Sequence, residues 1–263
     1  VTTTDNIVVL DHWDLEVVAT FSKTSLGFHS SEKPYDVLIS DDDTRAFVTA
    51  FGTYSNPSNE VHVLDLTGLP NSLTLETTIN TGGDTNCQFM AMSPDGSMFA
   101  VTLPNTDQAK VFLTSSPYDK VGTYEEEYNE QAHSPIAVDW APDGDAIYVG
   151  YLSGPYESSL SGNGAVRKCY IDEPNNCEHA LGVTNTVRDL AVTPSGIVWV
   201  ADDAGNLTGL GGSLFDPGEN TSGYDQQTGL LDGTGGCLDG DKRAIPCPAQ
   251  AQVGQSVGKL FLF

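Results

Sequence analysis

Positive charge is scarce in this chain, and that scarcity excludes several kinds of partner. The 263 residues include 11 Lys and Arg against 36 Asp and Glu, which gives a formal net charge of −25. Nucleic acids and anionic membrane surfaces are bound through clustered Lys and Arg, so neither is an expected partner. The charge favours a protein partner with a basic surface, divalent cations or a saline medium, and it also keeps a protein soluble.

Long apolar runs, helical patterns and familiar catalytic motifs are missing as well. No stretch approaches the roughly 20 apolar residues that a membrane span needs. The sequence shows no signal peptide and starts at Val1 rather than Met, so we expect a mature or trimmed product. Segment 124–132 is rich in Glu without an apolar stripe at helical spacing, which predicts a charged loop. There is no nucleophile elbow, phosphate loop, zinc-protease motif or haem-attachment motif.

Cysteine is infrequent, but its placement points to an oxidising compartment. Cys169 and Cys177 bracket a hairpin tip, and Cys237 and Cys247 bracket a polar loop. A disulfide closing a loop of either size stabilises a fold by roughly 2–3 kcal/mol. Disulfides persist outside the cytoplasm, so we expect an extracellular or periplasmic protein. Cys87, the fifth cysteine, belongs to neither pair and lies on a predicted inner strand, where we expect a buried, inert thiol.

One short phrase, an apolar run followed by a tight turn and a second apolar run, occurs four times. Its turns begin at Ser40, Ser93, Ala141 and Thr193, which are 53, 48 and 52 positions apart. In the second copy the turn is Ser93-Pro94-Asp95-Gly96, in which proline presets φ and glycine accepts a positive φ. A period near fifty residues built of short strands predicts a β-propeller.

Each repeat contains the four strands of one antiparallel blade. In the second copy, 89–92 and 98–102 would be the two inner strands, counted from the central axis. Outer pairs alternate in the same way, as in 61–65 with 73–79. A single blade cannot bury both of its faces, so blades must stack around a ring.

The chain divides into blades 1–202, a glycine-rich insertion 203–257 that contains the second cysteine pair, and a terminal blade strand 258–263. The repeats lie near 6–33, 34–85, 86–133, 134–185 and 186–202. Because the chain opens and ends on incomplete blades, two arrangements fit. It forms a small ring of four or five blades, or it is an incomplete part of a larger propeller.

Ligand sites in propellers are assembled from loops at one mouth of the channel. The segments that lead into the first strand of each blade lie on the same rim as the segments that follow the second strand. Polar residues near the starts of the first strands are therefore candidate ligand-binding groups, and we select five of them: His29, Asp36, Asp84, His133 and Arg188. Two imidazoles with a carboxylate nearby can bind a metal or relay protons, whereas exposed loop histidines are the alternative.

The insertion carries two further candidates. Asp232, Asp239 and Asp241 alternate with glycines, a pattern that supplies carboxylate and carbonyl oxygens for calcium, although it matches no complete calcium loop. No cofactor beyond this calcium is expected. Asn206 and Asn220 begin sequons and would accept glycans in a secreted protein.

Residues 61–65, 89–96 and 99–102, together with the outer strand 16–21, resemble the YVTN family of propeller repeats over 6–202. The resemblance implies a propeller related to bacterial surface and periplasmic propellers, lactonase-like propellers and subunits of quinone-dependent amine dehydrogenases. Such relatives commonly have seven blades, and this chain shows half to two-thirds of that. No catalytic set of those families can be carried over to this sequence.

Two functions follow as hypotheses. The first is a non-catalytic, secreted or periplasmic propeller that acts as a binding or scaffold subunit of a protein assembly. It follows from the lack of a catalytic motif and from the unpaired edge strands of the incomplete blades, which can pair with a strand of another chain. The alternative is a lactonase-like or quinone-dependent dehydrogenase-type enzyme with its site at the channel mouth.

Overall fold

The computed structural model describes residues 1–53, 58–83, 86–125, 133–153, 164–174, 177–180, 186–203, 205, 207–210, 237–238 and 244–245. Within these ranges the chain forms β-strands and two short 3₁₀ helices, η1 (Lys23–Leu26) and η2 (Pro104–Thr106). Neither of these helices has the length and apolar character that crossing a membrane requires. The predicted all-β class is confirmed.

The strands form antiparallel sheets in which chain neighbours pair. The first blade is β3 (Lys33–Ile39), β4 (Arg45–Phe51), β5 (Glu60–Asp65) and β6 (Thr74–Asn80). The second is β7 (Met90–Met92), β8 (Met98–Leu103), β9 (Gln108–Leu113) and β10 (Lys120–Glu125). The third is β11 (His133–Trp140), β12 (Ala146–Ser153), β13 (Ala165–Tyr170) and β14 (Cys177–Ala180). The fourth is β15 (Val187–Val192), β16 (Val198–Asp202) and β17 (Leu207–Leu210).

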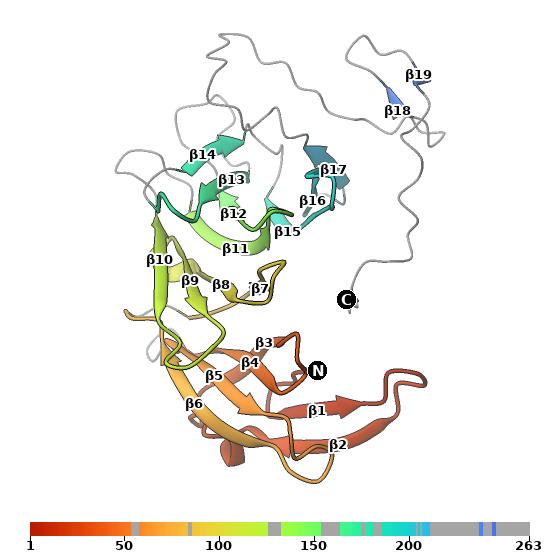
Figure 1. Cartoon of the computed structure of the whole chain (residues 1–263), viewed down its shortest axis with the longest axis vertical. Coiled ribbons are helices and arrows are strands. Elements are labelled where there is room, and N and C mark those ends of the chain that lie inside the picture. The colour runs from red at the N-terminus through yellow and green to blue at the C-terminus, as the bar shows by residue number, and fades with distance from the viewer. Residues whose placement is uncertain are drawn as a thin grey trace.

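Two smaller sheets complete the described strands. β1 (Asn6–Leu10) pairs with β2 (Val17–Ser22) to form the N-terminal hairpin, and β18 (Cys237–Leu238) pairs with β19 (Ala244–Ile245). Figure 1 shows the four blades following one another along an arc, with β3, β7, β11 and β15 on its concave side. This is the arrangement of a β-propeller, as predicted. Whether four, five or more blades complete the ring stays a prediction.

The repeated turns have the predicted conformation. In the second blade the Gly96 N–H donates to the Ser93 carbonyl at 2.9 Å, and φ of Gly96 is +70°. In the first blade Asp43 takes the place of the glycine, with φ of +57° and a hydrogen bond from its N–H to the Ser40 carbonyl. The run of three aspartates is therefore a β-turn, as expected from its place in the repeat.

Apolar side chains gather between neighbouring blades. Phe47 and Val63 of the first blade share one buried cluster with Phe99, Val101 and Phe112 of the second. The Phe47 and Phe99 rings lie 4.7 Å apart, a separation at which an aromatic pair contributes about 0.5–1.5 kcal/mol beyond its burial. Similar clusters join the second blade to the third and the third to the fourth. Stacking of blades thus buries the faces that no single blade could bury.

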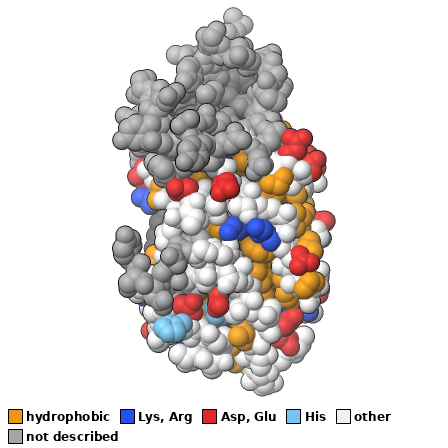
Figure 2. Space-filling model, turned by 90° about the vertical axis from the view of Figure 1, so that its left-hand side faces the viewer, with side chains coloured by type: hydrophobic (Ala, Val, Ile, Leu, Met, Phe, Trp, Pro, Cys, Tyr) orange, Lys and Arg blue, Asp and Glu red, His pale blue; other side chains and the backbone are white. Residues whose placement is uncertain are grey.

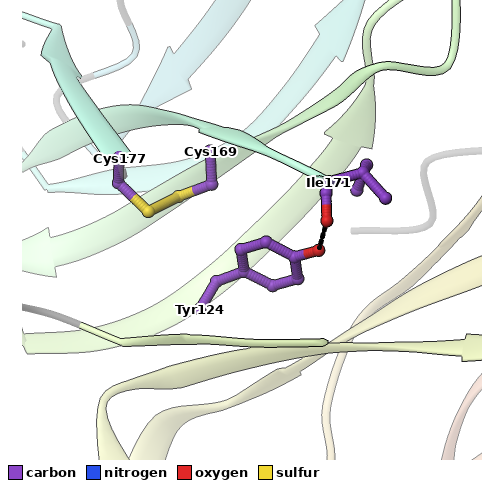
Figure 3. The surroundings of a disulfide bond; sticks show 4 residues. All are labelled: Tyr124, Cys169, Ile171 and Cys177. Carbon is purple, nitrogen blue, oxygen red and sulfur yellow. Dashed lines mark hydrogen bonds between the residues drawn. A yellow bond between two sulfur atoms is a disulfide. The ribbon is translucent and has the colours of Figure 1, made fainter. Parts of the chain in front are cut away.

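The disulfide between Cys169 and Cys177 is confirmed. It joins β13 to β14, with the two Cα atoms 4.1 Å apart. Figure 3 shows Tyr124 of the second blade beside it, and the Tyr124 hydroxyl donates to the Ile171 carbonyl at 3.1 Å. The cross-link therefore stiffens a hairpin tip that also contacts the preceding blade. Cys87 is a buried free thiol, as expected.

The remaining sequence predictions fall largely beyond the described ranges. Strand β10 includes Tyr124 and Glu125, so the predicted charged loop begins later than expected, and 126–132 are not described. Most of the insertion 203–257, including Cys247, and all of 258–263 lie outside the described residues. The pairing of Cys237 with Cys247 therefore stays a prediction.

Candidate functional site

One rim of the arc holds the starts of the inner strands. Because neighbouring strands are antiparallel, β3 and β5 begin on the rim where β4 and β6 end. Strands β7, β11 and β15 begin on the same rim, since each is the inner strand of its blade. Of the residues predicted to line the channel mouth, His29, Asp36 and Arg188 lie before or within the inner strands that begin on this rim.

His29 lies just before β3 and is exposed. Its Nδ1 is 2.8 Å from the Ser31 hydroxyl and accepts a hydrogen bond from the Ser31 backbone N–H at 3.3 Å. An imidazole held by one nitrogen leaves its other nitrogen at the surface. The placement agrees with an exposed loop histidine, and because Nδ1 accepts a hydrogen bond, the Nε2–H is the group left to donate to a bound molecule.

Asp36 lies in β3 and is engaged by two backbone groups. Its Oδ1 accepts the Val37 N–H and its Oδ2 accepts the Met90 N–H, both at 2.9 Å. Met90 belongs to the second blade, so the carboxylate ties two inner strands together. This carboxylate has a structural task that the sequence did not reveal.

Two exposed basic side chains lie at the starts of inner strands on this rim. Lys33 is the first residue of β3 and is exposed, and Arg188 in β15 is half-exposed. The Arg188 guanidinium lies 3.8 Å from the Asp203 carboxylate, an open pairing that leaves most of its donors available. On the outward face at the left of Figure 1, Figure 2 shows scattered acidic side chains together with some Lys and Arg side chains near its centre.

Several predicted site residues are not described in full. His133 begins β11 opposite Ser153, which puts its backbone on the same rim, but its side chain is not described. Asp84, the candidate calcium ligands Asp232, Asp239 and Asp241, and the sequon residues Asn206 and Asn220 lie outside the described residues. These assignments stay predictions.

A buried polar cluster lies beneath the rim of the first blade, and sequence reasoning missed it. His62 in β5 is wholly buried, with its ring stacked on Phe28 at a centroid distance of 3.7 Å. Its Nε2 lies 3.7 Å from an oxygen of Glu32 and 4.0 Å from an oxygen of Glu60. Both distances exceed that of a hydrogen bond. Across the described residues neither ring nitrogen of His62 has a hydrogen-bond partner.

Glu32 is held in place from two sides. Its Oε2 accepts the His29 N–H at 2.6 Å, and its Oε1 accepts the Ser58 hydroxyl at 2.7 Å. Burial alone would raise the pKa of the Glu32 carboxyl, but the nearby His62 imidazole and these two hydrogen bonds lower it to about 2. The carboxylate is therefore ionised at neutral pH.

The second blade supports this cluster from outside. Asn86, which lies just before β7, accepts the N–H of Gly52 at 2.8 Å and that of Ser58 at 3.0 Å through its Oδ1. Ser58 in turn orients Glu32. A chain of hydrogen bonds thus runs from the second blade to the carboxylate beside His62.

Part of this cluster could have been read from the sequence. Glu60 and His62 are two positions apart on a strand, so their side chains point to one face. Glu32 is 28 positions earlier than Glu60, and no spacing rule connects it to them. Its place depends on how β3 and β5 align within the blade.

Comparison with known proteins identifies the fold. No family model matches the chain, and no curated protein matches it either. Among solved structures, a Bacteroides fragilis protein provisionally assigned as a 6-phosphogluconolactonase superposes with a TM-score of 0.58 at 13% identity, covering 80% of this chain and 62% of that one. A periplasmic gluconolactonase of Pseudomonas aeruginosa gives a TM-score of 0.57 at 16% identity, covering 80% and 60%. Hydrazine synthase of Kuenenia stuttgartiensis gives 0.53 at 15% identity, covering 84% and 62%.

At these identities the likeness shows the fold alone. The chain spans about three-fifths of the length of these structures, 60–62% in the three cases. They agree with the predicted propeller and with its lactonase-like relatives, while the YVTN repeat family itself has no matching family model. The chain therefore shares the β-propeller fold of these proteins.

Proposed function

We propose that this protein is a lactonase-like propeller enzyme that hydrolyses a sugar lactone bearing a negative charge. The observation that carries the proposal is that three exposed basic side chains of an otherwise acidic chain, His29, Lys33 and Arg188, lie before or at the starts of inner strands. The likeness to two propellers named for lactone hydrolysis supports it. This proposal prefers the enzyme over the binding subunit that the sequence favoured.

The rim carries the groups that lactone hydrolysis needs. Water must attack the ring carbonyl, and an imidazole with one free nitrogen can take the proton from that water as a general base. A nearby guanidinium or ammonium can bind a phosphate or carboxylate on the sugar and stabilise the oxyanion that forms. We assign the first role to His133, at the start of β11, and the second to Arg188. Lys33 and the Nε2–H of His29 support Arg188 as donors.

A hydrolysis assay tests the proposal. The full chain is mixed with 6-phosphogluconolactone or with the uncharged glucono-δ-lactone, and acid release is followed against the uncatalysed rate. We expect Arg188→Ala to raise KM for the phosphorylated lactone at least tenfold, while His133→Ala lowers kcat. Lys120→Ala is the matched control, because Lys120 is exposed at the start of β10, on the opposite rim. Uncatalysed rates for both lactones would refute the activity, and an unchanged KM in Arg188→Ala would refute the assignment.

One observation favours a second function, the binding subunit of a protein assembly. The N-terminal hairpin exposes large apolar side chains, with Trp13 84%, Leu15 56% and Val17 64% accessible. Contiguous exposed apolar side chains mark contact surfaces. Size-exclusion chromatography with light scattering tests this role on the purified protein and on Trp13→Ser. If both elute as compact monomers at the same volume, the result speaks against a binding subunit.

We also propose an extracellular or periplasmic location. The Cys169–Cys177 disulfide supports an oxidising compartment. Thiol titration of protein taken directly from its native source checks this, since a cytoplasmic protein would contain both cysteines in reduced form.

A further inference from the structure

We propose that Glu32, Glu60 and His62 form a binding site for one divalent transition-metal ion of the zinc class. The site lies beneath the rim of the first blade, and the inference does not depend on the proposed lactonase activity. It rests on the geometry of the three side chains, on the isolation of the imidazole and on the way in which Glu32 is held.

The three ligand atoms stand at the separations that a bound ion would impose. One atom from each residue can be chosen so that all three lie within 4.8 Å of one another. The Nε2 of His62 is 3.7 Å from Glu32 and 4.0 Å from Glu60. Ligands about 2.1 Å from a tetrahedral zinc ion are about 3.4 Å apart, so small side-chain adjustments would close the site. The atoms are too distant to satisfy one another by hydrogen bonds.

The His62 imidazole is buried, and neither of its nitrogens has a hydrogen-bond partner among the described residues. An unpaired buried polar group destabilises a fold, so buried polar groups are nearly always satisfied. The second blade provides an internal comparison, because Lys110 in β9 occupies the position of His62 in β5, each the third residue of its strand. His62 pairs with Val48 and Lys110 with Val101, which are the fourth residues of β4 and β8. The Lys110 ammonium donates to the Thr81 carbonyl at 2.5 Å. A metal ion on Nε2 would give His62 the partner that Lys110 already has.

The carboxylates are prepared for a cation. The orientation of the Glu32 carboxylate is fixed by the Ser58 hydroxyl and the His29 N–H, which act as the outer hydrogen bonds that metal-binding carboxylates usually have. The Glu60 side chain is 38% exposed, so the cluster opens to solvent on that side. An ion could enter past Glu60 and retain a water molecule there.

The ligand set selects the class of metal. Imidazole nitrogen combined with carboxylate oxygen suits zinc and its first-row neighbours, whereas calcium takes six to eight oxygens and magnesium retains most of its waters. Three protein ligands with one open position are the arrangement of zinc sites that bind water.

Titration of the full chain with Zn²⁺ tests the site. Protein is freed of metal by chelator and dialysis, and Zn²⁺ binding is followed by calorimetry and by thermal unfolding. We expect one ion per chain, and a rise in Tm of about 5–10 °C at a hundredfold excess over Kd. Ca²⁺ and Mg²⁺ at equal concentration should leave Tm unchanged.

Three variants decide the assignment. Glu60→Gln should weaken Zn²⁺ binding at least tenfold, and since Glu60 is partly exposed the variant should fold. His62→Leu should abolish Zn²⁺ binding, and circular dichroism checks that the metal-free variant is folded, since leucine fills the space beside Phe28 with an apolar group. His12→Ala, an exposed histidine of the N-terminal hairpin, should bind like the wild type. No Zn²⁺ binding by the wild type, or binding unchanged in Glu60→Gln, would overturn the proposal.

Discussion

Tyr118 and Glu76 join the second blade to the outermost strand of the first. The Tyr118 hydroxyl donates to Glu76 Oε1 at 2.6 Å, and Arg45 Nε donates to the other oxygen of the same carboxylate at 2.8 Å. Burial and the adjacent Glu76 carboxylate raise the pKa of Tyr118 to about 12. The phenol therefore stays protonated, and able to donate, at every pH at which the protein is used.

Removing this hydroxyl should loosen the contact between the two blades. We expect Tyr118→Phe to lower the free energy of unfolding by about 1–2 kcal/mol, since the hydrogen bond has a charged acceptor that is only partly exposed. Urea unfolding at pH 7 measures the loss. Tyr35→Phe is the control, because Tyr35 is 41% exposed on β3 and its change should stay within about 0.5 kcal/mol. Equal losses of unfolding free energy in both variants would show that the Tyr118–Glu76 hydrogen bond does not stabilise the fold.

The sequence predicted the parts of this fold that are set by local chemistry. The four turns, the inner hairpins and the Cys169–Cys177 link each depend on residues fewer than a dozen positions apart. Proline, glycine and the aspartate of the turn fix the corner wherever it occurs. The register of each hairpin then follows from its turn.

Contacts between blades could not be read in the same way. Asp36 was predicted as a mouth residue, yet it accepts the N–H of Met90, 54 positions away. His62 looked like an ordinary strand residue, and only the alignment of β3 with β5 brings it to Glu32. Repeat spacing places blades next to one another but does not reveal which polar groups meet between them.

The Asp43 turn offers a gain in stability. Asp43 has a φ of +57°, a conformation that costs a residue with a side chain roughly 1 kcal/mol relative to glycine. Asp43→Gly restores the residue found in the other three turns and should raise the free energy of unfolding by about 0.5–1 kcal/mol. Thermal and urea unfolding measure the change.

The reverse change in the second blade should be harmful. A Cβ on Gly96 would lie 2.4 Å from an oxygen of Asp41 in the adjacent turn, and φ there is +70°. We expect Gly96→Ala to lower stability by about 1–3 kcal/mol. Gly196→Ala separates the two causes, since a Cβ there meets nothing within 4 Å and only the φ cost remains. A smaller loss in Gly196→Ala than in Gly96→Ala is the expected order.

The disulfide should contribute to stability by closing the loop between β13 and β14. Replacing Cys169 and Cys177 together by serine should lower the free energy of unfolding by about 2–3 kcal/mol, the value for closing a loop of this length. A reductant should destabilise the wild type by a similar amount and leave the double variant unaffected. Cys87→Ala should remain sensitive to reductant, because Cys87 is a free thiol. A wild type that ignores the reductant under unfolding conditions would contradict this account.

Acid should weaken the fold through Glu32. Because folding lowers the pKa of Glu32 from its ordinary value of 4.5 to about 2, the ionised carboxylate stabilises the native state above pH 4.5. That contribution declines as pH falls from 4.5 towards 2, where the native carboxylate also becomes protonated. Glu32→Gln should therefore be less stable than the wild type at pH 7, by up to about 3 kcal/mol, and the difference should shrink at pH 3. Urea unfolding at both pH values measures it, with the exposed Glu16→Gln as control. A difference that is the same at pH 7 and pH 3 would mean that Glu32 acts through packing and not through its charge.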